Sequence, residues 1–371
     1  MLTVFYSVVP FLIFLSLLVF VHELGHYWVA KRNGVKVEVF SIGFGPEVFG
    51  WTDKSGTRWK LSLIPLGGYV RMFSDLNAAS APDHQAIAAM GETERKQALH
   101  AQPVGVRLAV SAAGPAANYL FAILLLAGIY SVHGQRVASE EARIGLVQKG
   151  SAAAEAGLKE DDRILKINGE ETPTFKAMQE IVRARPGEAL TLTYARDGQQ
   201  QTVSITPMSR TAGGQTIGVL GVGQGYEVVQ RNPVAGVYHA SVDALRFSWM
   251  TLQSIGQMIT GQRSADDLSG PIGIAAMSGE VAKKSLHDIL WFIALLSINL
   301  GLINLLPVPM LDGGHILFYL IEAVRGRPVS ERAQEMAFRV GFAFLIFVFL
   351  FSTWKDLANL KAIEFLVGLF K

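Results

Sequence analysis

The sequence predicts a multi-pass α-helical membrane protein with four spans, a membrane-associated β-hairpin and an inserted α+β domain. Three observations lead to this fold class. Half of the 371 residues are hydrophobic and only 17% are charged, whereas a soluble domain usually carries about 25% charged residues. Several apolar runs have the length of a membrane-spanning helix. Two other regions alternate apolar and polar residues at the period of a β-strand.

The four candidate spans are apolar runs. Three of them contain no charged residue, namely 4–21, 108–132 and 289–311. The fourth run, 340–354, is shorter than the roughly 17 to 25 residues of a span, but Arg339 and Lys355 flank it and can reach the two interfaces. We therefore expect membrane helices within residues 1–34, 104–132, 288–318 and 338–356, and a C-terminal tail over 357–371.

Basic residues in the short loops predict the orientation. Lys31, Arg32 and Lys36 follow the first span, and several arginines lie between the third and the fourth. With four spans both clusters fall on one side, which the positive-inside rule makes cytoplasmic. The two termini and residues 133–288 are then expected outside.

Residues 35–74 predict a membrane-associated β-hairpin. Apolar residues alternate with polar or small ones on both arms, and residues 53–56 supply the turn. Gly43 and Gly45 interrupt the first arm, which indicates a bulge or a close backbone approach. The stretch 75–103, rich in alanine and charged residues, is expected to be a cytoplasmic linker.

Residues 140–208 predict a compact α+β domain. Ser151 and Gly157 are placed as the cap and the stop of a short helix, and Asn168-Gly169 is typical of a tight hairpin turn.

The segment 209–287 is expected to be extracytoplasmic and to contain an amphipathic helix at 236–260. Its apolar face consists of Val242, Leu245, Trp249, Leu252 and Ile255. This face either packs on the rest of the protein or lies on the membrane surface, and the sequence favours neither.

Composition excludes several kinds of function. The chain has no cysteine, which removes disulfides, cysteine nucleophiles and thiolate metal sites. A net charge of +2 is too small to indicate nucleic-acid binding.

The strongest chemical pattern is His22-Glu23-Leu24-Gly25-His26 at the end of the first span. Residues four apart share one face of a helix, so both imidazoles can bind one zinc ion. Glu23 then lies beside the metal, where it can take a proton from water. Ionisable groups at this depth are costly and are functional by default, although a polar helix end at the headgroups is the alternative.

A catalytic zinc takes three protein ligands and leaves one position for water. The third apolar run ends in residues 304–315, where Pro307 and Pro309 are expected to break the helix. Unwound backbone at membrane depth must be buried in protein or line a wet cavity. Asp312 and His315 both offer ligand atoms there. A helix cap is the alternative for Asp312, and for His315 a packing or outer-sphere role is favoured.

The HExxH pattern and residues 304–315 resemble the site-two protease family of intramembrane zinc metalloproteases. The nearest branch is the regulator of sigma E protease type, which has a PDZ domain between its second and third core helices. The resemblance covers nearly the whole chain, since motifs at 43–46, 113–118 and 268–273 also match. Well-known members carry two tandem PDZ domains, whereas one is found here, at 140–208.

The resemblance implies the catalytic roles. His22, His26 and Asp312 would hold one zinc ion, and Glu23 would be the acid/base of a metalloendopeptidase. Asn299 and Asn304 resemble the two asparagines of the third core helix, the second of which is associated with substrate positioning.

The resemblance also implies substrate contacts. Gly43, Phe44 and Gly45 belong to the membrane-embedded hairpin, which is expected to contact substrate. Ile144-Gly145-Leu146-Val147 resembles the loop of the PDZ domain that binds a peptide carboxylate.

Location and partners follow from the same resemblance. The protein would lie in a bacterial inner membrane, with the PDZ domain periplasmic and the active site towards the cytoplasm. Its substrates would be single-pass membrane proteins such as anti-sigma factors or remnant signal peptides, already cut by an upstream site-one protease, and lipid would surround the spans.

Two rival functions are open to the residues alone. One is a membrane scaffold with a structural or dead metal site, and the other is a transporter that uses Asp312 as an ion site. The intact Glu23 disfavours the first, and the absence of repeated halves disfavours the second.

Overall fold

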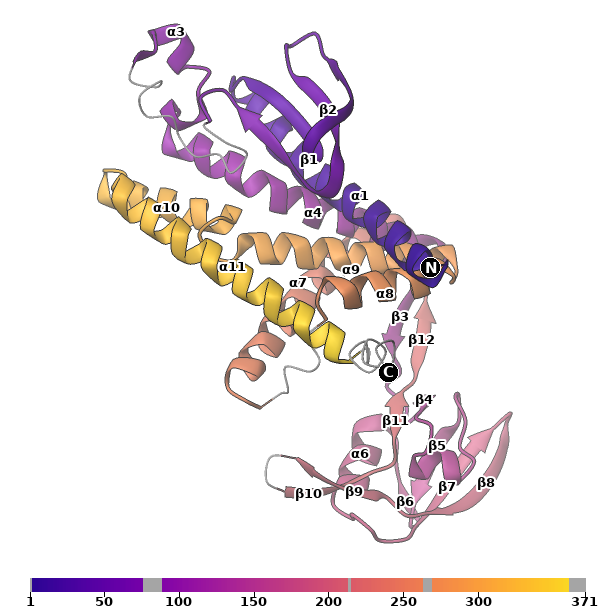
Figure 1. Cartoon of the computed structure of the whole chain (residues 1–371). Coiled ribbons are helices and arrows are strands. Elements are labelled where there is room, and N and C mark those ends of the chain that lie inside the picture. The colour runs from indigo at the N-terminus through magenta and orange to yellow at the C-terminus, as the bar shows by residue number, and fades with distance from the viewer. Residues whose placement is uncertain (1, 76–88, 213–214, 263–268, 360–371) are drawn as a thin grey trace, which may run out of the picture. The chain divides into compact units, whose positions relative to one another are not determined.

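The computed structural model describes residues 2–75, 89–212, 215–262 and 269–359. They form two compact units, a helical unit (residues 1–128 and 236–371) and an inserted unit (residues 129–235). Figure 1 labels the elements of both.

The helical unit holds most of the helices and one sheet. Its elements are α1 (Leu2–Arg32), β1 (Val37–Thr52), β2 (Arg58–Met72), α3 (Glu92–Arg95), a 3₁₀ turn (Leu99–Ala101), α4 (Val104–Val132), α7 (Pro233–Ile259), α8 (Pro271–Ala282), α9 (Leu286–Leu305), α10 (Asp312–Arg325) and α11 (Glu331–Asn359). Helices α4 and α7 continue into the inserted unit at their ends.

Four of the described helices, α1, α4, α9 and α11, are long and apolar enough to cross a membrane. The four expected spans are therefore confirmed by length and composition. Helix α11 begins at Glu331, earlier than the expected 338. Of the linker over 75–103 and the tail over 357–371, residues 76–88 and 360–371 lie outside the described part of the chain.

The third expected span is two helices. Helix α9 ends at Leu305, Pro307 and Pro309 lie in the following loop, and α10 begins at Asp312. A proline lacks the backbone N–H that continues a helix, and Met310 has a positive φ of 85°. The predicted break is confirmed, and the expected region 288–318 contains most of α9 and the start of α10.

The expected hairpin is a sheet folded over on itself. Residues 39–42 of β1 pair with 58–61 of β2 on one side and with 68–71 on the other. The strand β1 bends at Gly43 and Gly45, whose φ angles are 88° and 86°. A Cβ atom at Gly43 would lie 2.7 Å from the carbonyl oxygen of Ile64, so the predicted close backbone approach is confirmed. Residues 68–72 form one edge of this sheet.

Aromatic side chains join the sheet to α1. Phe40 stacks on Trp59 at 4.2 Å between ring centroids, and Tyr27 of α1 meets both rings edge-on. Asp53, in the turn, accepts hydrogen bonds from the Tyr27 hydroxyl at 3.1 Å and from Trp59 Nε1 at 3.0 Å. Burial acts to raise the pKa of Asp53, but hydrogen bonds from Ser55, Trp59 and the backbone hold that pKa well below its usual range.

Helix α8 connects α11 to the start of α1. Asp356 of α11 is 4% exposed and accepts hydrogen bonds from the backbone N–H groups of Gly270 at 2.9 Å and Gly273 at 2.8 Å. The carboxylate thereby caps α8 from another helix. A Cβ atom at Gly279 would lie 2.7 Å from Ser7 Oγ of α1, so the two helices touch closely there.

The apolar face of α7 is uncovered in the helical unit. Leu245 is 68% exposed and Trp249 is 67% exposed. A neighbouring face is buried and consists of the small residues Gly236, Ala240, Ala244 and Ser248. Among the described residues nothing covers this part of the apolar face, so the alternative that it packs on the rest of the protein is wrong.

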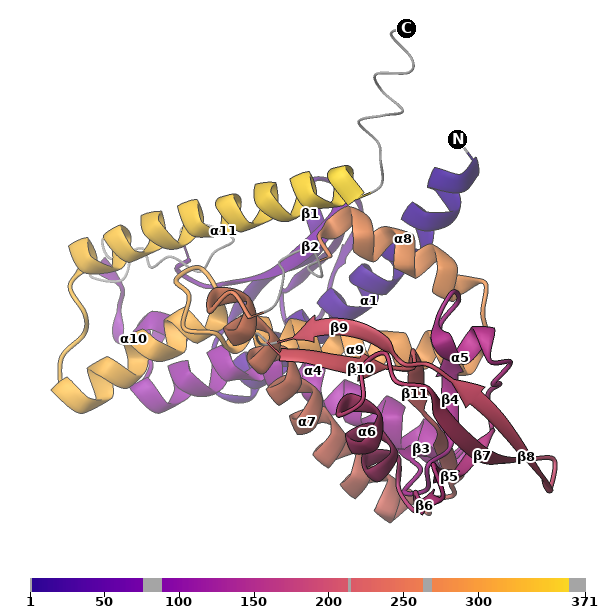
Figure 2. The same cartoon turned by 90° about the horizontal axis from the view of Figure 1, so that it is seen from below.

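The inserted unit is mostly β-structure. Its elements are β3 (Gln135–Ala138), β4 (Ile144–Val147), α5 (Ala152–Glu155), β5 (Arg163–Ile167), β6 (Glu170–Glu171), α6 (Phe175–Arg183), β7 (Leu190–Arg196), β8 (Gln199–Ile205), β9 (Met208–Ala212), β10 (Gln215–Val219), β11 (Val222–Gln224) and β12 (Tyr226–Val229). The main sheet has the order β6-β5-β7-β8, with β4 paired to β11 and β9 to β10 (Figure 2), and β3 pairs with β12 (Figure 1).

This unit extends beyond the expected boundaries of 140–208. Strand β3 lies before them and β9 to β12 lie after them, and β11 and β12 pair back with β4 and β3. The first part of the segment 209–287 therefore belongs to this unit. The local predictions inside it hold: Ser151 caps α5, and Asn168-Gly169 turns with φ angles of 48° and 83°.

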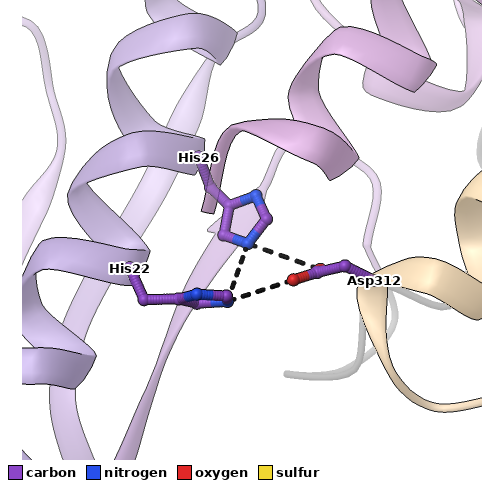
Figure 3. A group of neighbouring side chains, drawn as sticks. All are labelled: His22, His26 and Asp312. Carbon is purple, nitrogen blue, oxygen red and sulfur yellow. Dashed lines mark hydrogen bonds and ion pairs between the residues drawn. The ribbon is translucent and has the colours of Figure 1, made fainter. Parts of the chain in front are cut away.

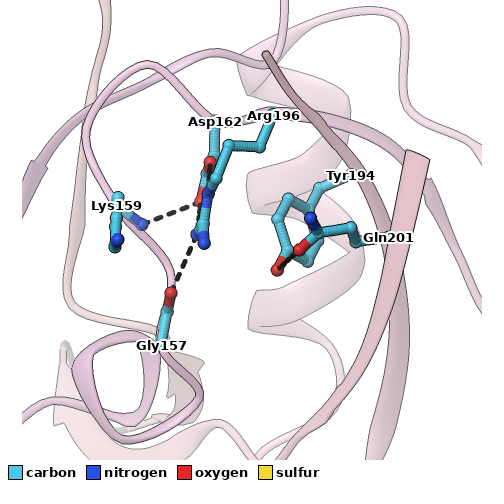
Figure 4. A network of polar contacts seen from close by, with 6 residues as sticks. All are labelled: Gly157, Lys159, Asp162, Tyr194, Arg196 and Gln201. Atoms are coloured by element: carbon cyan, nitrogen blue, oxygen red, sulfur yellow. Dashed lines mark hydrogen bonds and ion pairs between the residues drawn. The ribbon is translucent and has the colours of Figure 1, made fainter. Parts of the chain in front are cut away.

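A hydrogen-bonded ion pair lies inside this unit (Figure 4). Asp162 is 1% exposed. Its two oxygens accept from Nε and Nη2 of Arg196, both at 2.7 Å, and Oδ2 also accepts from the backbone N–H of Lys159 at 2.7 Å. Arg196 donates further to the carbonyl of Gly157 at 2.8 Å. The bonds to Asp162 raise the pKa of Arg196 above its ordinary value.

Candidate metal centre

Three side chains from two separate helices converge inside the helical unit (Figure 3). His22 and His26 come from α1, and Asp312 is the first residue of α10. The Nε2 atoms of the two histidines are 3.2 Å apart. Asp312 Oδ2 lies 3.1 Å from Nε2 of His22, and Oδ1 lies 3.4 Å from Nε2 of His26. One nitrogen of each ring and one carboxylate thus point at a common place.

Local sequence explains how each ligand reaches this place. The i, i+4 spacing puts His22 and His26 on one face of α1. The proline-containing loop ends α9 and lets α10 begin at Asp312, where Leu311 occupies the capping position without a side-chain hydrogen bond. Asp312 does not cap the helix through its side chain, so that alternative is not observed. Its carboxylate faces the histidines.

Glycines allow α4 to approach this centre. A Cβ atom at Gly25 of α1 would lie 2.3 Å from the carbonyl oxygen of Ala113 of α4. A Cβ atom at Gly114 would lie 2.3 Å from Nε2 of His26 and 2.8 Å from Nε2 of His22. Since any side chain at Gly114 would occupy the space beside both nitrogens, only glycine keeps that space open.

A cavity of about 290 Å³ adjoins the three ligands. Glu23 lines it between the histidines and the sheet edge at Gly67 to Val70, and a Cβ atom at Gly68 would lie 3.2 Å from Cγ of Glu23. Asn304 of α9 and His315 of α10 also line the cavity. Two carboxyl groups, three histidines and an amide therefore share one space.

The donor set fits zinc. The ligand atoms of His22, His26 and Asp312 all lie within 4.8 Å of one another, and they are the only such group among the described residues. Oδ2 of Asp312 is buried and accepts no hydrogen bond within the described part of the chain. Two imidazoles and one carboxylate are the set found in hydrolytic zinc sites, which leave a fourth position open. His315 does not belong to the group.

Comparison with known proteins agrees with this chemistry. The model of peptidase family M50 matches residues 10–348. The chain belongs to peptidase family M50. A relative from Rhizobium meliloti is 41% identical over 95% of this chain and 96% of its own length. Metalloprotease MmpA of Caulobacter vibrioides is 36% identical over 98% of both chains, and zinc metalloprotease RasP of Geobacillus kaustophilus is 32% identical over 95% of this chain and 97% of its own.

Membership of the M50 family establishes the reaction class. The chain is a zinc metalloprotease and a membrane protein, and its substrates are membrane proteins in general. The scaffold and transporter hypotheses are therefore set aside.

The inserted unit has weaker structural support. The PDZ domain of an SdrC-like protein from Listeria monocytogenes matches 24% of this chain and 93% of that domain, with 18% identity and a TM-score of 0.21. The PDZ assignment stays a prediction.

The cavity distinguishes the two predicted substrate-binding asparagines. Asn304 lines the cavity. Asn299 does not: it accepts a hydrogen bond from Thr251 Oγ1 of α7 at 3.0 Å and donates to the carbonyl of Leu295 at 3.1 Å. The structure therefore brings one of the two predicted asparagines to the metal centre.

The other predicted substrate residues do not line the cavity. Gly43, Phe44 and Gly45 form the bend of β1, and Phe44 stacks at 5.9 Å on Tyr69, which lines the cavity. Residues 144–147 form strand β4, and Ile144 is fully buried in the core of the inserted unit. A carboxylate-binding loop at these four residues is not what the structure shows, and peptide binding there stays a prediction.

Sequence reasoning missed two features of the site. Asn118 of α4 is fully buried and contacts His22. Arg107 of α4 forms a two-pronged ion pair with Glu322 of α10, at 2.9 and 2.5 Å, and its guanidinium lies 4.8 Å from the ring centroid of Tyr319. A polar side chain within an apolar helix is the signal that could have found both.

Proposed function

We propose that this enzyme hydrolyses peptide bonds within the transmembrane segments of membrane-anchored proteins. The observation that carries the proposal is the placement of the metal ligands: two of them lie on a helix that can span a membrane, beside a cavity lined by an acid and a sheet edge. A protease of soluble substrates has no need to bury its ligands on such a helix.

His22, His26 and Asp312 would hold zinc, which supplies Lewis-acid activation of water and polarises the scissile carbonyl. Glu23 lines the same cavity and accepts the proton of the attacking water. The same carboxyl group then returns the proton to the leaving amine.

The sheet edge offers a way to bind an unwound substrate. A transmembrane helix hides its carbonyl groups in its own hydrogen bonds, so it must open at the cut. Residues 68–72 pair with β1 on one side only among the described residues, and Gly68 to Val70 line the cavity. A substrate strand added to this edge would lie beside Glu23.

Asn304 would hold an exposed carbonyl of the unwound substrate. We expect Asn304→Ala to lower kcat/KM by about tenfold or more, since one such hydrogen bond contributes roughly 1.5 kcal/mol. Zinc content should stay that of the parent enzyme. Asn299→Ala is the matched control, because its amide bonds Thr251 outside the cavity. Equal losses of kcat/KM in both variants would show that Asn304 does not hold the substrate carbonyl.

The orientation and the partners remain part of the proposal. The enzyme would lie in a bacterial inner membrane with both termini and the inserted unit outside the cytoplasm, and it would cut anti-sigma factors or remnant signal peptides after a first cut by a site-one protease. A reporter at Gly198 tests the orientation: a cytoplasmic reporter would overturn the four-span topology. The exposed apolar face of α7 would rest on lipid.

The inserted unit would act as a filter that favours trimmed substrates. Its two ends meet, because the backbone N–H of Ser139 donates to the carbonyl of Gly225 at 2.8 Å. Residues 140–224 can therefore be replaced by a short linker. Cleavage of full-length and trimmed substrates is compared between the intact enzyme and the linker variant. If both enzymes favour the trimmed form equally, the inserted unit is not the filter.

A further inference from the structure

Helix α4 presents three positions, 110, 114 and 118, to the two histidines. They are four residues apart and so share one face of the helix. Gly114 leaves room beside both Nε2 atoms. The carbonyl of Val110 lies 2.8 Å from Nδ1 of His26, and the amide of Asn118 lies 3.1 Å from Nδ1 of His22. Each histidine therefore has an α4 partner at the ring nitrogen that faces away from the ligand cluster.

The partner of His26 fixes its tautomer. A backbone carbonyl can only accept a hydrogen bond, so Nδ1 of His26 carries the proton. Its Nε2 atom then keeps a free lone pair towards Asp312, at 3.4 Å. This is the arrangement that a metal-bound histidine requires.

His22 needs the same arrangement but meets a side chain instead of a carbonyl. Its Nε2 atom faces Asp312 at 3.1 Å, so Nδ1 must carry the proton when Nε2 serves as a ligand. Asn118 is the partner of Nδ1, and an amide can present either oxygen or NH₂. With NH₂ towards His22, Oδ1 of Asn118 is buried without a hydrogen bond. A half-turn of the amide places Oδ1 where it accepts from Nδ1.

The backbone at Asn118 is itself held in place. Ser297 of α9, fully buried, donates a hydrogen bond from Oγ to the carbonyl of Asn118 at 2.8 Å. The neighbouring Tyr119 bonds Ser248 of α7 at 2.7 Å between hydroxyl oxygens. The amide of Asn118 is therefore offered to His22 from a position fixed by two other helices.

We propose that Asn118 is a positioning residue for zinc: its side-chain oxygen accepts the Nδ1 proton of His22, which selects the tautomer and the ring orientation that let Nε2 bind the metal. The inference rests on zinc binding by His22, His26 and Asp312. It predicts that an oxygen acceptor at position 118 is what matters, rather than the volume of the side chain.

Substitutions at position 118 separate the acceptor from the volume. Asn118→Asp keeps an oxygen acceptor, and Asn118→Leu keeps the size without one. Zinc affinity of the full-length protein, measured by competition with a chelating dye, should fall about 10- to 100-fold in Asn118→Leu and stay within about threefold of the parent in Asn118→Asp. The visible spectrum of the cobalt-substituted protein should change in Asn118→Leu only.

Controls keep the result decisive. Asn299→Leu places the same change in α9, at a position that does not line the cavity, and should leave zinc affinity unchanged. If Asn118→Leu does not fold, Asn118→Ala replaces it. The proposal is overturned if Asn118→Leu, or Asn118→Ala in its place, binds zinc as tightly as the parent. It is also overturned if Asn118→Asp loses as much zinc affinity as Asn118→Leu. Failure of the zinc site itself would look different, since His22→Ala would then bind zinc like the parent.

Discussion

Two buried polar clusters of this protein differ in how completely their atoms are paired. In the inserted unit, both oxygens of Asp162 accept short hydrogen bonds, and Arg196 donates to Asp162 and to a carbonyl. In the helical unit, Oδ2 of Asp312 is buried without a hydrogen bond in the described part of the chain, and the nitrogen that faces it at 3.1 Å, Nε2 of His22, is itself a ligand atom.

The contrast distinguishes structure from function. A buried polar group without a partner costs free energy, so a fold retains it only where something else uses it. Both oxygens of Asp162 already accept hydrogen bonds, so this network can stabilise the fold but offers no free oxygen to a ligand. The metal centre keeps an open space beside Gly114 and a carboxylate that faces two ligand nitrogens. Substitutions in the two clusters should therefore fail in opposite ways.

The largest effect is expected from Glu23→Gln. The amide keeps the shape but cannot accept a proton, so cleavage should fall about 10²- to 10⁴-fold. Zinc content and thermal unfolding should remain parental, because Glu23 is not among the three ligands. Cleavage of a transmembrane substrate and metal analysis measure the two quantities. Substantial residual cleavage would remove Glu23 as the base.

The second expectation sets Asp312→Asn against Asp162→Asn. Loss of one of three ligands should lower zinc affinity at least about 100-fold, with little change in hydrogen exchange of the inserted unit. Asp162→Asn should do the reverse: it lowers the unfolding midpoint of the inserted unit by about 5 °C and leaves zinc bound. If either variant loses both zinc affinity and stability of the inserted unit, the two clusters do not have separate roles.

A third substitution tests whether His315 belongs to the metal centre. His315 lines the cavity, and its ring lies 5.5 Å from the ring centroid of Phe338, but it is not part of the ligand group. Zinc affinity of His315→Ala should stay within about threefold of the parent. Zinc loss in His315→Ala, with retention in Asp312→Ala, would reassign the third ligand.

Much of this site could be predicted because its signals are local. The spacing of His22 and His26 follows from the helix period alone, and the prolines before Asp312 mark the break. The distinction between Asn299 and Asn304 could not be predicted in the same way. Positions five apart differ by about 140° around a helix, but only the fold shows which side faces the cavity.

Long-range pairing limits the prediction of the fold. The two arms of the hairpin were visible as alternating residues, but their double pairing depends on where β1 bends at Gly43 and Gly45. The predicted bounds of the inserted unit, 140–208, are too short because β11 and β12 pair with strands far earlier in the chain. The contact of Asn118 with His22 could not be predicted, because it joins two helices far apart in sequence.

The smallest expected effect tests whether the inserted unit behaves as an ordinary folded domain. Thr174 is extended, with φ −128° and ψ 154°, and its side-chain oxygen accepts a hydrogen bond from the backbone N–H of Ala177 at 3.1 Å at the start of α6. Thr174→Ala removes this cap and should cost about 1 kcal/mol. Faster hydrogen exchange in residues 175–183 measures the loss. Thr174→Ser keeps the cap and is the matched control.

Zinc binding and cleavage should not change, because the cap serves only local stability. If Thr174→Ala exchanges like the parent, the cap contributes nothing; if it loses zinc, stability of the inserted unit and metal binding are coupled and the two clusters are not independent.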